Sequence, residues 1–249
     1  MSPTPAPFSV PPAIFADAIR YFWVQRDKQA ASARGGEGQA QNVRGGRHLD
    51  ELQAAIVTLM IDHGVPPGDI FSNCELHKTG KLELPGFFRP TKQWDLLVVR
   101  EGHLLAAMEL KAQVGPSFGN NFNNRTEEAI GSATDLWTAF RESAFLHSPQ
   151  PWLGYLFLLE DDEKSQRPVR NPQPHFAVFS EFHDASYAKR YELFCRKLVL
   201  ERKYNAACFL MSQRPQPATP SSHTVYSEPS DDLNARQFLS SLLRAVIPL

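Results

Sequence analysis

The sequence predicts an α/β or α+β domain in which a mixed β-sheet is flanked by helices. Two apolar runs, residues 94–99 and 104–114, are joined by a short turn containing Gly102, which is the pattern of a β-hairpin. Two later apolar runs of strand length, 152–160 and 206–212, are separated by a helical pattern. The run at 152–160 is continuously apolar, so we expect a central strand buried on both faces. Helices before, between and after these runs complete the fold.

The segment before the hairpin contains two predicted helices. Residues 1–12 are rich in proline and should form an irregular arm. Apolar residues at helical spacing predict helices over 12–28 and 49–63. Between them, residues 30–47 contain five glycines and almost no large apolar side chain, which predicts a flexible loop. Short strands and turns are expected over 68–92.

The segment after the hairpin alternates helices and strands. Residues 115–126 are polar and rich in Asn and Gly, which predicts a loop. Thr126 should cap a helix that runs over 127–143. Residues 175–182 are interpreted as a further strand. The remaining expectations are helices over 185–203 and 231–246, with a long loop over 213–230.

Composition sets the class of protein without naming its function. No long low-complexity stretch divides the 249 residues, so we expect residues 1–249 to form one domain. The net charge of −1 neither indicates nor excludes a nucleic-acid partner, because only a cleft needs to be basic. Three cysteines without C-x-x-C spacing are typical of reduced, buried thiols in a cytoplasmic protein. The sequence has no secretory signal pattern and no apolar stretch of membrane-spanning length.

Three charged residues in the apolar hairpin indicate chemistry. Glu109 and Lys111 are two residues apart on one strand, so their side chains point to the same side. A turn centred on residues 101 and 102 places Asp95 opposite residues 108–110. Charges in such a setting are costly unless they are paired or bind a metal. A slip of one residue in register would separate the two carboxylates.

Asp95 and Glu109 have the chemistry of a magnesium site. Mg²⁺ prefers oxygen ligands, and the backbone carbonyl of Leu110 is a natural third ligand. A metal held there polarises a scissile phosphate, and Lys111 is placed to orient or deprotonate the attacking water. The alternative is an ordinary solvated set of charges on an edge strand.

This pattern resembles the PD-(D/E)XK nuclease superfamily, in which an acid begins one strand and E-x-K lies on the next, with helices on both sides. Trp94 stands where the motif has Pro, and Gln113 completes an E-x-K-x-Q arrangement that also occurs there. The superfamily sometimes adds an acid from the first core helix, which here would be Glu51. A solvated first-turn glutamate is an equally good interpretation of Glu51.

Two stretches resemble XhoI-type type II restriction endonucleases more closely: LELPGFFRPTKQWDLLVV and MELKAQVGPSFGNNFNNRTEEAIGSATDLW. The resemblance covers most of the chain. It implies Mg²⁺-dependent cleavage of double-stranded DNA at the palindrome CTCGAG, after the first C, leaving 5′-phosphate ends. A palindromic target implies a homodimer, and a restriction system implies a DNA methyltransferase that protects the same site.

Candidate DNA contacts flank the catalytic strand. Arg89 and Lys92 are placed to touch phosphates near the cut, and Gln113 lies beyond Lys111. The segment after the strand offers amides suited to adenine and a guanidinium suited to guanine: Asn120, Asn121, Asn123, Asn124 and Arg125. The same residues also fit phosphate contacts or a plain turn.

Two other functions remain open at this point. A structure-specific repair nuclease of the same superfamily would cut by DNA structure rather than sequence. A non-catalytic DNA-binding module would bind without metal-dependent turnover.

Overall fold

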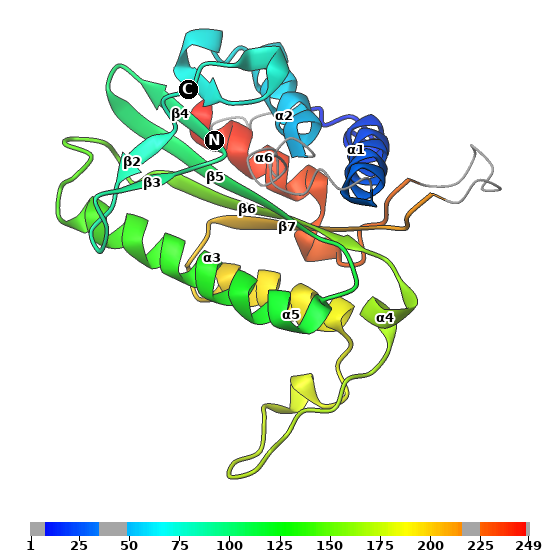
Figure 1. The fold of residues 1–249 in the computed structure, drawn as a ribbon. Coiled ribbons are helices and arrows are strands. Elements are labelled where there is room, and N and C mark those ends of the chain that lie inside the picture. Colours follow the sequence, from blue (N-terminus) through cyan, green and yellow to red (C-terminus); the bar gives the residue numbers. More distant parts are fainter. Residues whose placement is uncertain (1–7, 35–48, 216–224, 248–249) are drawn as a thin grey trace, which may run out of the picture.

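The computed structural model describes residues 8–34, 49–215 and 225–247 and centres on a five-stranded mixed sheet (Figure 1). The strands, in spatial order, are β1 (Ile70–Ser72), β4 (Leu96–Arg100), β5 (His103–Gln113), β6 (Trp152–Glu160) and β7 (Ala206–Ser212). The pairs β1–β4 and β4–β5 are antiparallel, whereas β5–β6 and β6–β7 are parallel. A separate two-stranded hairpin precedes β4 and consists of β2 (Glu83–Pro85) and β3 (Thr91–Gln93).

Helices cover both faces of the sheet (Figure 1). One face packs against α1 (Ala16–Arg34), α2 (Asp50–Asp62) and α6 (Ala235–Val246). The other face packs against α3 (Phe118–Arg141) and α5 (Tyr187–Leu200). The short helix α4 (Glu163–Gln166) follows β6.

Strand alternation assigns each residue of β5 to one of these faces. Met108 and Leu110 belong to the core beneath α1, α2 and α6. Ala107 belongs to the core beneath α3 and α5, and this is therefore the face to which Glu109 and Lys111 point. The helix α2 lies on the opposite face from both charged residues.

The predicted mixed sheet with flanking helices is confirmed. The hairpin expected from runs 94–99 and 104–114 is the β4–β5 pair, and the runs 152–160 and 206–212 are strands with those bounds. The predicted helix over 49–63 is α2, within one residue at each end. Cys74, Cys195 and Cys208 are free and buried, as their spacing suggested.

The predicted polar loop over 115–126 is wrong, because α3 begins at Phe118. Thr126 is not a cap: its hydroxyl donates to the carbonyl of Phe122 inside the helix. Phe118 stacks on the ring of Tyr187 and Phe122 packs against Tyr191, both on α5. This aromatic packing one helical turn apart outweighs the low helix propensity of the asparagines and glycine around it.

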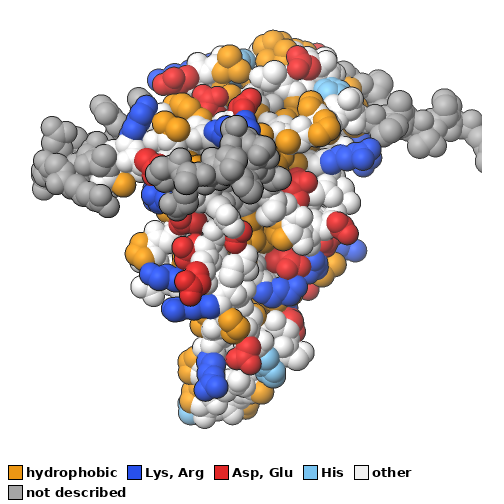
Figure 2. Space-filling model, turned by 90° about the vertical axis from the view of Figure 1, so that its right-hand side faces the viewer, with side chains coloured by type: hydrophobic (Ala, Val, Ile, Leu, Met, Phe, Trp, Pro, Cys, Tyr) orange, Lys and Arg blue, Asp and Glu red, His pale blue; other side chains and the backbone are white. Residues whose placement is uncertain are grey.

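The predicted strand over 175–182 is also wrong. Within it only Ser180–Phe182 is regular, as one turn of 3-10 helix. It lies in an arm, residues 167–186, that projects below the body in Figure 1 and forms the narrow lower part of Figure 2. Phe176 and Phe179 are 88% and 74% exposed there, so the apolar run lacks a sheet to join.

Two predicted loops fall partly outside the described residues. The helix α1 continues to Arg34, into the segment predicted to be a loop from residue 30, and the rest of that segment is not described. In the segment 213–230, residues 216–224 are likewise outside the described ranges, and Ser227 pairs with the end of β7. In the described parts of the chain, no helix is long and apolar enough to cross a membrane.

Candidate active site

The β4–β5 hairpin brings Asp95 to Glu109. Leu96 pairs with Met108, and the backbone N–H of Asp95 donates to the carbonyl of Met108 at 3.1 Å. Continuing that register by one residue sets Asp95 opposite Glu109. Of the three positions that the sequence left open, residues 108–110, the chain adopts the middle one.

Lys111 contacts both carboxylates on the α3 and α5 face. Its Nζ lies 2.8 Å from Oε1 of Glu109 and 3.7 Å from Oδ2 of Asp95. The backbone N–H of Leu110 donates to the same Oδ2 at 2.7 Å, which fixes the Asp95 side chain. The three residues predicted to form the chemical centre are thus together.

Leu110 also presents its carbonyl on the Asp95 side. The N–H and C=O of a strand residue point the same way, and no residue of β4 pairs with Leu110. Two carboxylates and one carbonyl form an oxygen-only donor set, which fits a hard divalent cation.

Burial and neighbouring charge act differently on the two carboxylates. Burial raises the pKa of the Asp95 carboxyl, and the nearby Lys111 offsets this only in part. Burial also disfavours ionised Glu109, which is 4% exposed, but Lys111 and Lys92 outweigh it and leave the pKa lowered. Glu109 is therefore held ionised, whereas the ionised form of Asp95 is destabilised.

Lys92 lies inside the site rather than at its rim. Its Nζ is 3.3 Å from Oε1 of Glu109, the atom that Lys111 also contacts, and its side chain is 12% exposed. The same Nζ donates to the carbonyl of Gln93 at 3.0 Å and lies 4.2 Å from the centre of the Trp94 ring. Burial lowers the pKa of Lys92 despite the neighbouring Glu109. Sequence reasoning placed Lys92 near phosphates but did not foresee this ion pair.

Tyr204 completes the surroundings of Glu109 and was not anticipated. Its hydroxyl donates to the carbonyl of Ala129 at 3.1 Å and lies 3.4 Å from Oε2 of Glu109. Tyr204 follows α5 in a turn, and no sequence motif connects it to β5.

Asp135 is a second residue that sequence reasoning missed. This buried acid of α3 accepts the backbone N–H groups of Phe87 and Phe88 at 2.7 and 2.8 Å and the Nε of Arg89 at 2.7 Å. It thereby ties the tip of the β2–β3 hairpin to α3. The available signal was an acid next to Leu136 on the apolar face of a helix. Arg89, predicted to contact phosphate, is held by this ion pair with its side chain 45% exposed.

The predicted DNA-contacting amides lie on the first half of α3. Asn120, Asn123 and Asn124 are exposed, whereas Asn121 is half-buried. Arg125 pairs with Glu128, and its charge is close enough to act on the pKa of Lys111. Gln113, at the end of β5, is buried, and its amide donates to the carbonyl of Val114.

The structure does not bring Glu51 to the pair. Glu51 lies in the first turn of α2, on the other face of the sheet from Glu109. Within the described residues, no group of three His, Cys, Asp or Glu side chains is placed to hold a metal.

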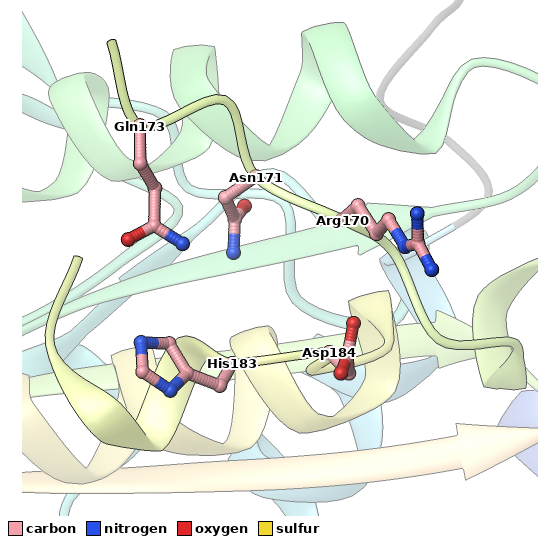
Figure 3. A pocket seen from close by; sticks show the side chains of 5 residues that line it. All are labelled: Arg170, Asn171, Gln173, His183 and Asp184. Carbon is pink, nitrogen blue, oxygen red and sulfur yellow. The ribbon is translucent and has the colours of Figure 1, made fainter. Parts of the chain in front are cut away.

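A cavity of about 370 Å³ lies away from these residues, at the base of the arm. Figure 3 shows its lining, in which residues of the outgoing chain face residues of the returning chain. The lining consists of Arg170, Asn171, Gln173, His183 and Asp184. It contains none of the predicted site residues.

Comparisons with known proteins find related restriction enzymes. The family model described as restriction endonuclease XhoI matches residues 28–224. The type II restriction enzyme BstVI of Geobacillus stearothermophilus is 51% identical over 225 residues, covering 88% of this chain and 95% of that protein. The type II restriction enzyme XhoI of Xanthomonas vasicola is 46% identical over 185 residues, covering 74% and 73%.

A third relative is the type II restriction enzyme AbrI of Azospirillum brasilense, 44% identical over 164 residues, covering 64% of this chain and 71% of that protein. No solved structure matches the chain. The family match spans the β4–β5 hairpin with Asp95, Glu109 and Lys111, and the relatives cover most of the chain. The chain belongs to the XhoI family of restriction endonucleases.

Proposed function

We propose that this protein is a type II restriction endonuclease that hydrolyses phosphodiester bonds of double-stranded DNA with Mg²⁺. The observation that carries the proposal is the position of Lys111, whose ammonium contacts both Asp95 and Glu109 on one face of the hairpin. The same three residues would sit at the cut phosphate. The chain would act in the cytoplasm, as a single domain over residues 1–249.

The residues divide the chemistry between them. Asp95, Glu109 and the Leu110 carbonyl would hold Mg²⁺, which supplies Lewis-acid polarisation of the phosphate and a more acidic water. Lys111 would hold and orient that water for in-line attack and steady the charge that develops on phosphorus. The hydrogen bond from Leu110 to Asp95 keeps the aspartate in place for this role.

The DNA site follows from the family resemblance. We propose cleavage at CTCGAG after the first C, giving 5′-phosphate ends, by a homodimer in which each active site cuts one strand. A methyltransferase acting on the same site would protect the host DNA.

The base and phosphate contacts would come from the first half of α3 and the β2–β3 hairpin. Exposure of Asn120, Asn123 and Asn124 beside the end of β5 supports contacts to DNA. Asn121, Arg125, Gln113 and Arg89 lie around the same site and would serve as secondary contacts. Glu51 lies on the other face of the sheet from Glu109. We therefore assign the metal to Asp95, Glu109 and the Leu110 carbonyl.

Digestion of a long DNA of known sequence tests the proposal. With Mg²⁺ we expect discrete fragments with ends at CTCGAG, and with a chelator no cleavage. Asp95→Ala and Lys111→Ala should abolish cleavage while circular dichroism shows an intact fold, and Lys78→Gln, at an exposed lysine, is the control. Full activity in both active-site variants refutes the assignment. Cleavage at ends or mismatches regardless of sequence indicates a repair nuclease instead.

A further inference from the structure

Glu109 is paired with more positive charge than the nuclease motif requires. Both Lys111 and Lys92 lie within ion-pair distance of a single oxygen, Oε1, at 2.8 and 3.3 Å. With Asp95, the four side chains form a cluster of two carboxylates and two ammonium groups. The motif residues account for three of them, and Lys92 is the addition.

This cluster is electrically balanced without any metal. The two carboxylates therefore do not present the net negative charge that attracts a divalent cation. An ammonium at 3.3 Å from Oε1 also competes for the same oxygen, because Lys92 and a bound cation would repel each other across it. Lys92 has to leave Oε1 when a divalent cation is bound by Glu109.

Lys92 is able to move while its backbone stays fixed. Its strand β3 pairs with β2, and Asp135 holds the tip of that hairpin through three hydrogen bonds. Its side chain has a flexible four-carbon stem. A rotation of the side chain alone would release the Glu109 oxygen.

We propose that Lys92 is a displaceable counter-ion: it neutralises Glu109 in the free enzyme, yields to the divalent cation, and then pairs with a DNA phosphate next to the cut. This rests on the proposed metal-dependent cleavage. When Lys92 leaves Glu109 it loses its negatively charged partner, and an incoming DNA phosphate would replace that partner. Metal and DNA would thereby favour each other's binding, since DNA gives the released ammonium a partner.

Metal binding without DNA tests whether Lys92 competes with the divalent cation for Glu109. Ca²⁺ titrations by calorimetry would compare the wild type, Lys92→Met, Lys92→Arg and the exposed-site control Lys78→Gln. We expect Lys92→Met to bind Ca²⁺ more tightly by on the order of tenfold, because the competing charge is gone. Lys92→Arg keeps the charge and should stay near the wild type, as should Lys78→Gln.

DNA binding tests whether Lys92 pairs with a DNA phosphate. The salt dependence of affinity for a CTCGAG duplex, with Ca²⁺ replacing Mg²⁺, reports the number of phosphate contacts. The slope of log affinity against log salt is negative, and Lys92→Met should make it less steep by about one per active site. Lys92→Arg should restore the wild-type slope. A purely structural role for Lys92 would leave this slope unchanged.

The outcomes separate this inference from the proposed function. If the wild type cuts CTCGAG with Mg²⁺ but Lys92→Met binds Ca²⁺ no more tightly than the wild type, the counter-ion role is overturned and the function stands. An unchanged salt slope overturns the phosphate contact. If the wild type neither binds divalent cations nor cuts, the proposed function itself has failed. Thermal unfolding of each variant confirms that folded proteins are compared.

Discussion

Two carboxylates that serve one site stand in opposite electrostatic states. The pKa of Asp95 is raised because burial destabilises its ionised form, whereas Lys111 and Lys92 lower the pKa of Glu109 despite burial. A raised carboxyl pKa means that the folded state disfavours the charge, and a lowered pKa means that it favours it. At neutral pH, Asp95 therefore costs stability and Glu109 contributes it.

Amide substitutions should reveal this difference at the residue scale. Asp95→Asn removes a disfavoured charge and keeps an oxygen for the Leu110 N–H, so the free energy of unfolding should rise or stay level. Glu109→Gln removes the carboxylate that both Lys92 and Lys111 contact and leaves Lys111 only its longer contact to Asp95, so the free energy of unfolding should fall by about 1–3 kcal/mol. Urea unfolding at pH 7 without divalent ions measures both. The reverse order of stabilities contradicts the argument, and both variants should lose cleavage.

The sequence could predict which side chains lie together only where a short turn connects the strands that carry them. Asp95, Glu109 and Lys111 share one hairpin, so alternation and a single register fix their relation. Tertiary packing brings Lys92 and Tyr204 to Glu109 and brings Asp135 to the β2–β3 hairpin. No local period encodes that packing, so the roles of these three residues required the structure.

At the scale of elements, the β2–β3 hairpin depends on one carboxylate of α3. Asp135→Ala leaves the N–H groups of Phe87 and Phe88 without their acceptor and removes the ion pair of Arg89. We therefore expect the free energy of unfolding to fall by about 1–3 kcal/mol. Cleavage should also fall, because the hairpin carries Lys92. Urea unfolding and a plasmid assay measure the two effects, with Glu127→Ala, an exposed acid of α3, as control.

A second change tests the same contact from the hairpin side. A Cβ added at Gly86 would lie 2.6 Å from Oδ2 of Asp135 and 2.7 Å from the Arg89 carbonyl. Gly86→Ala should therefore resemble Asp135→Ala. Wild-type stability in both would show that the hairpin has other anchors.

The first half of α3 illustrates why element boundaries escaped the sequence. Asparagine and glycine favour turns, so local propensity predicted a loop over 115–126. The helix forms because Phe118 and Phe122 bury their rings against α5. The projecting arm shows the converse: the apolar run at 175–182 has strand composition, but it has no neighbouring strand.

Exposed asparagines in a helix are a cost unless they serve another purpose. Asn123 and Asn124 are exposed on α3, where alanine has the higher helix propensity. The double variant Asn123→Ala/Asn124→Ala should gain up to about 1 kcal/mol of stability and lose affinity for a CTCGAG duplex. Unfolding and fluorescence anisotropy measure the two. Unchanged DNA affinity would remove these residues from the proposed interface.

At the scale of the whole molecule, one chain offers one proposed catalytic hairpin, β4–β5, whereas cutting double-stranded DNA through needs two strands broken. The charged side chains on the face in Figure 2 are of both signs, in keeping with the net charge of −1, so DNA capture would depend on the local site. The proposed two-fold dimer would supply two active sites, because a palindrome would present the same bases to each protomer. Each Lys111 would then serve one strand.

Mixed dimers test this division of labour. When wild-type chains are co-expressed with an excess of tagged Lys111→Ala chains and the mixed species is purified, each dimer holds one competent site. We expect supercoiled plasmid with a single CTCGAG to become an open circle and to reach the linear form much more slowly than with wild-type enzyme. Agarose gels resolve the three forms. Direct conversion to linear DNA at the wild-type rate would mean that one active site cuts both strands, and the two-fold arrangement would have to be abandoned.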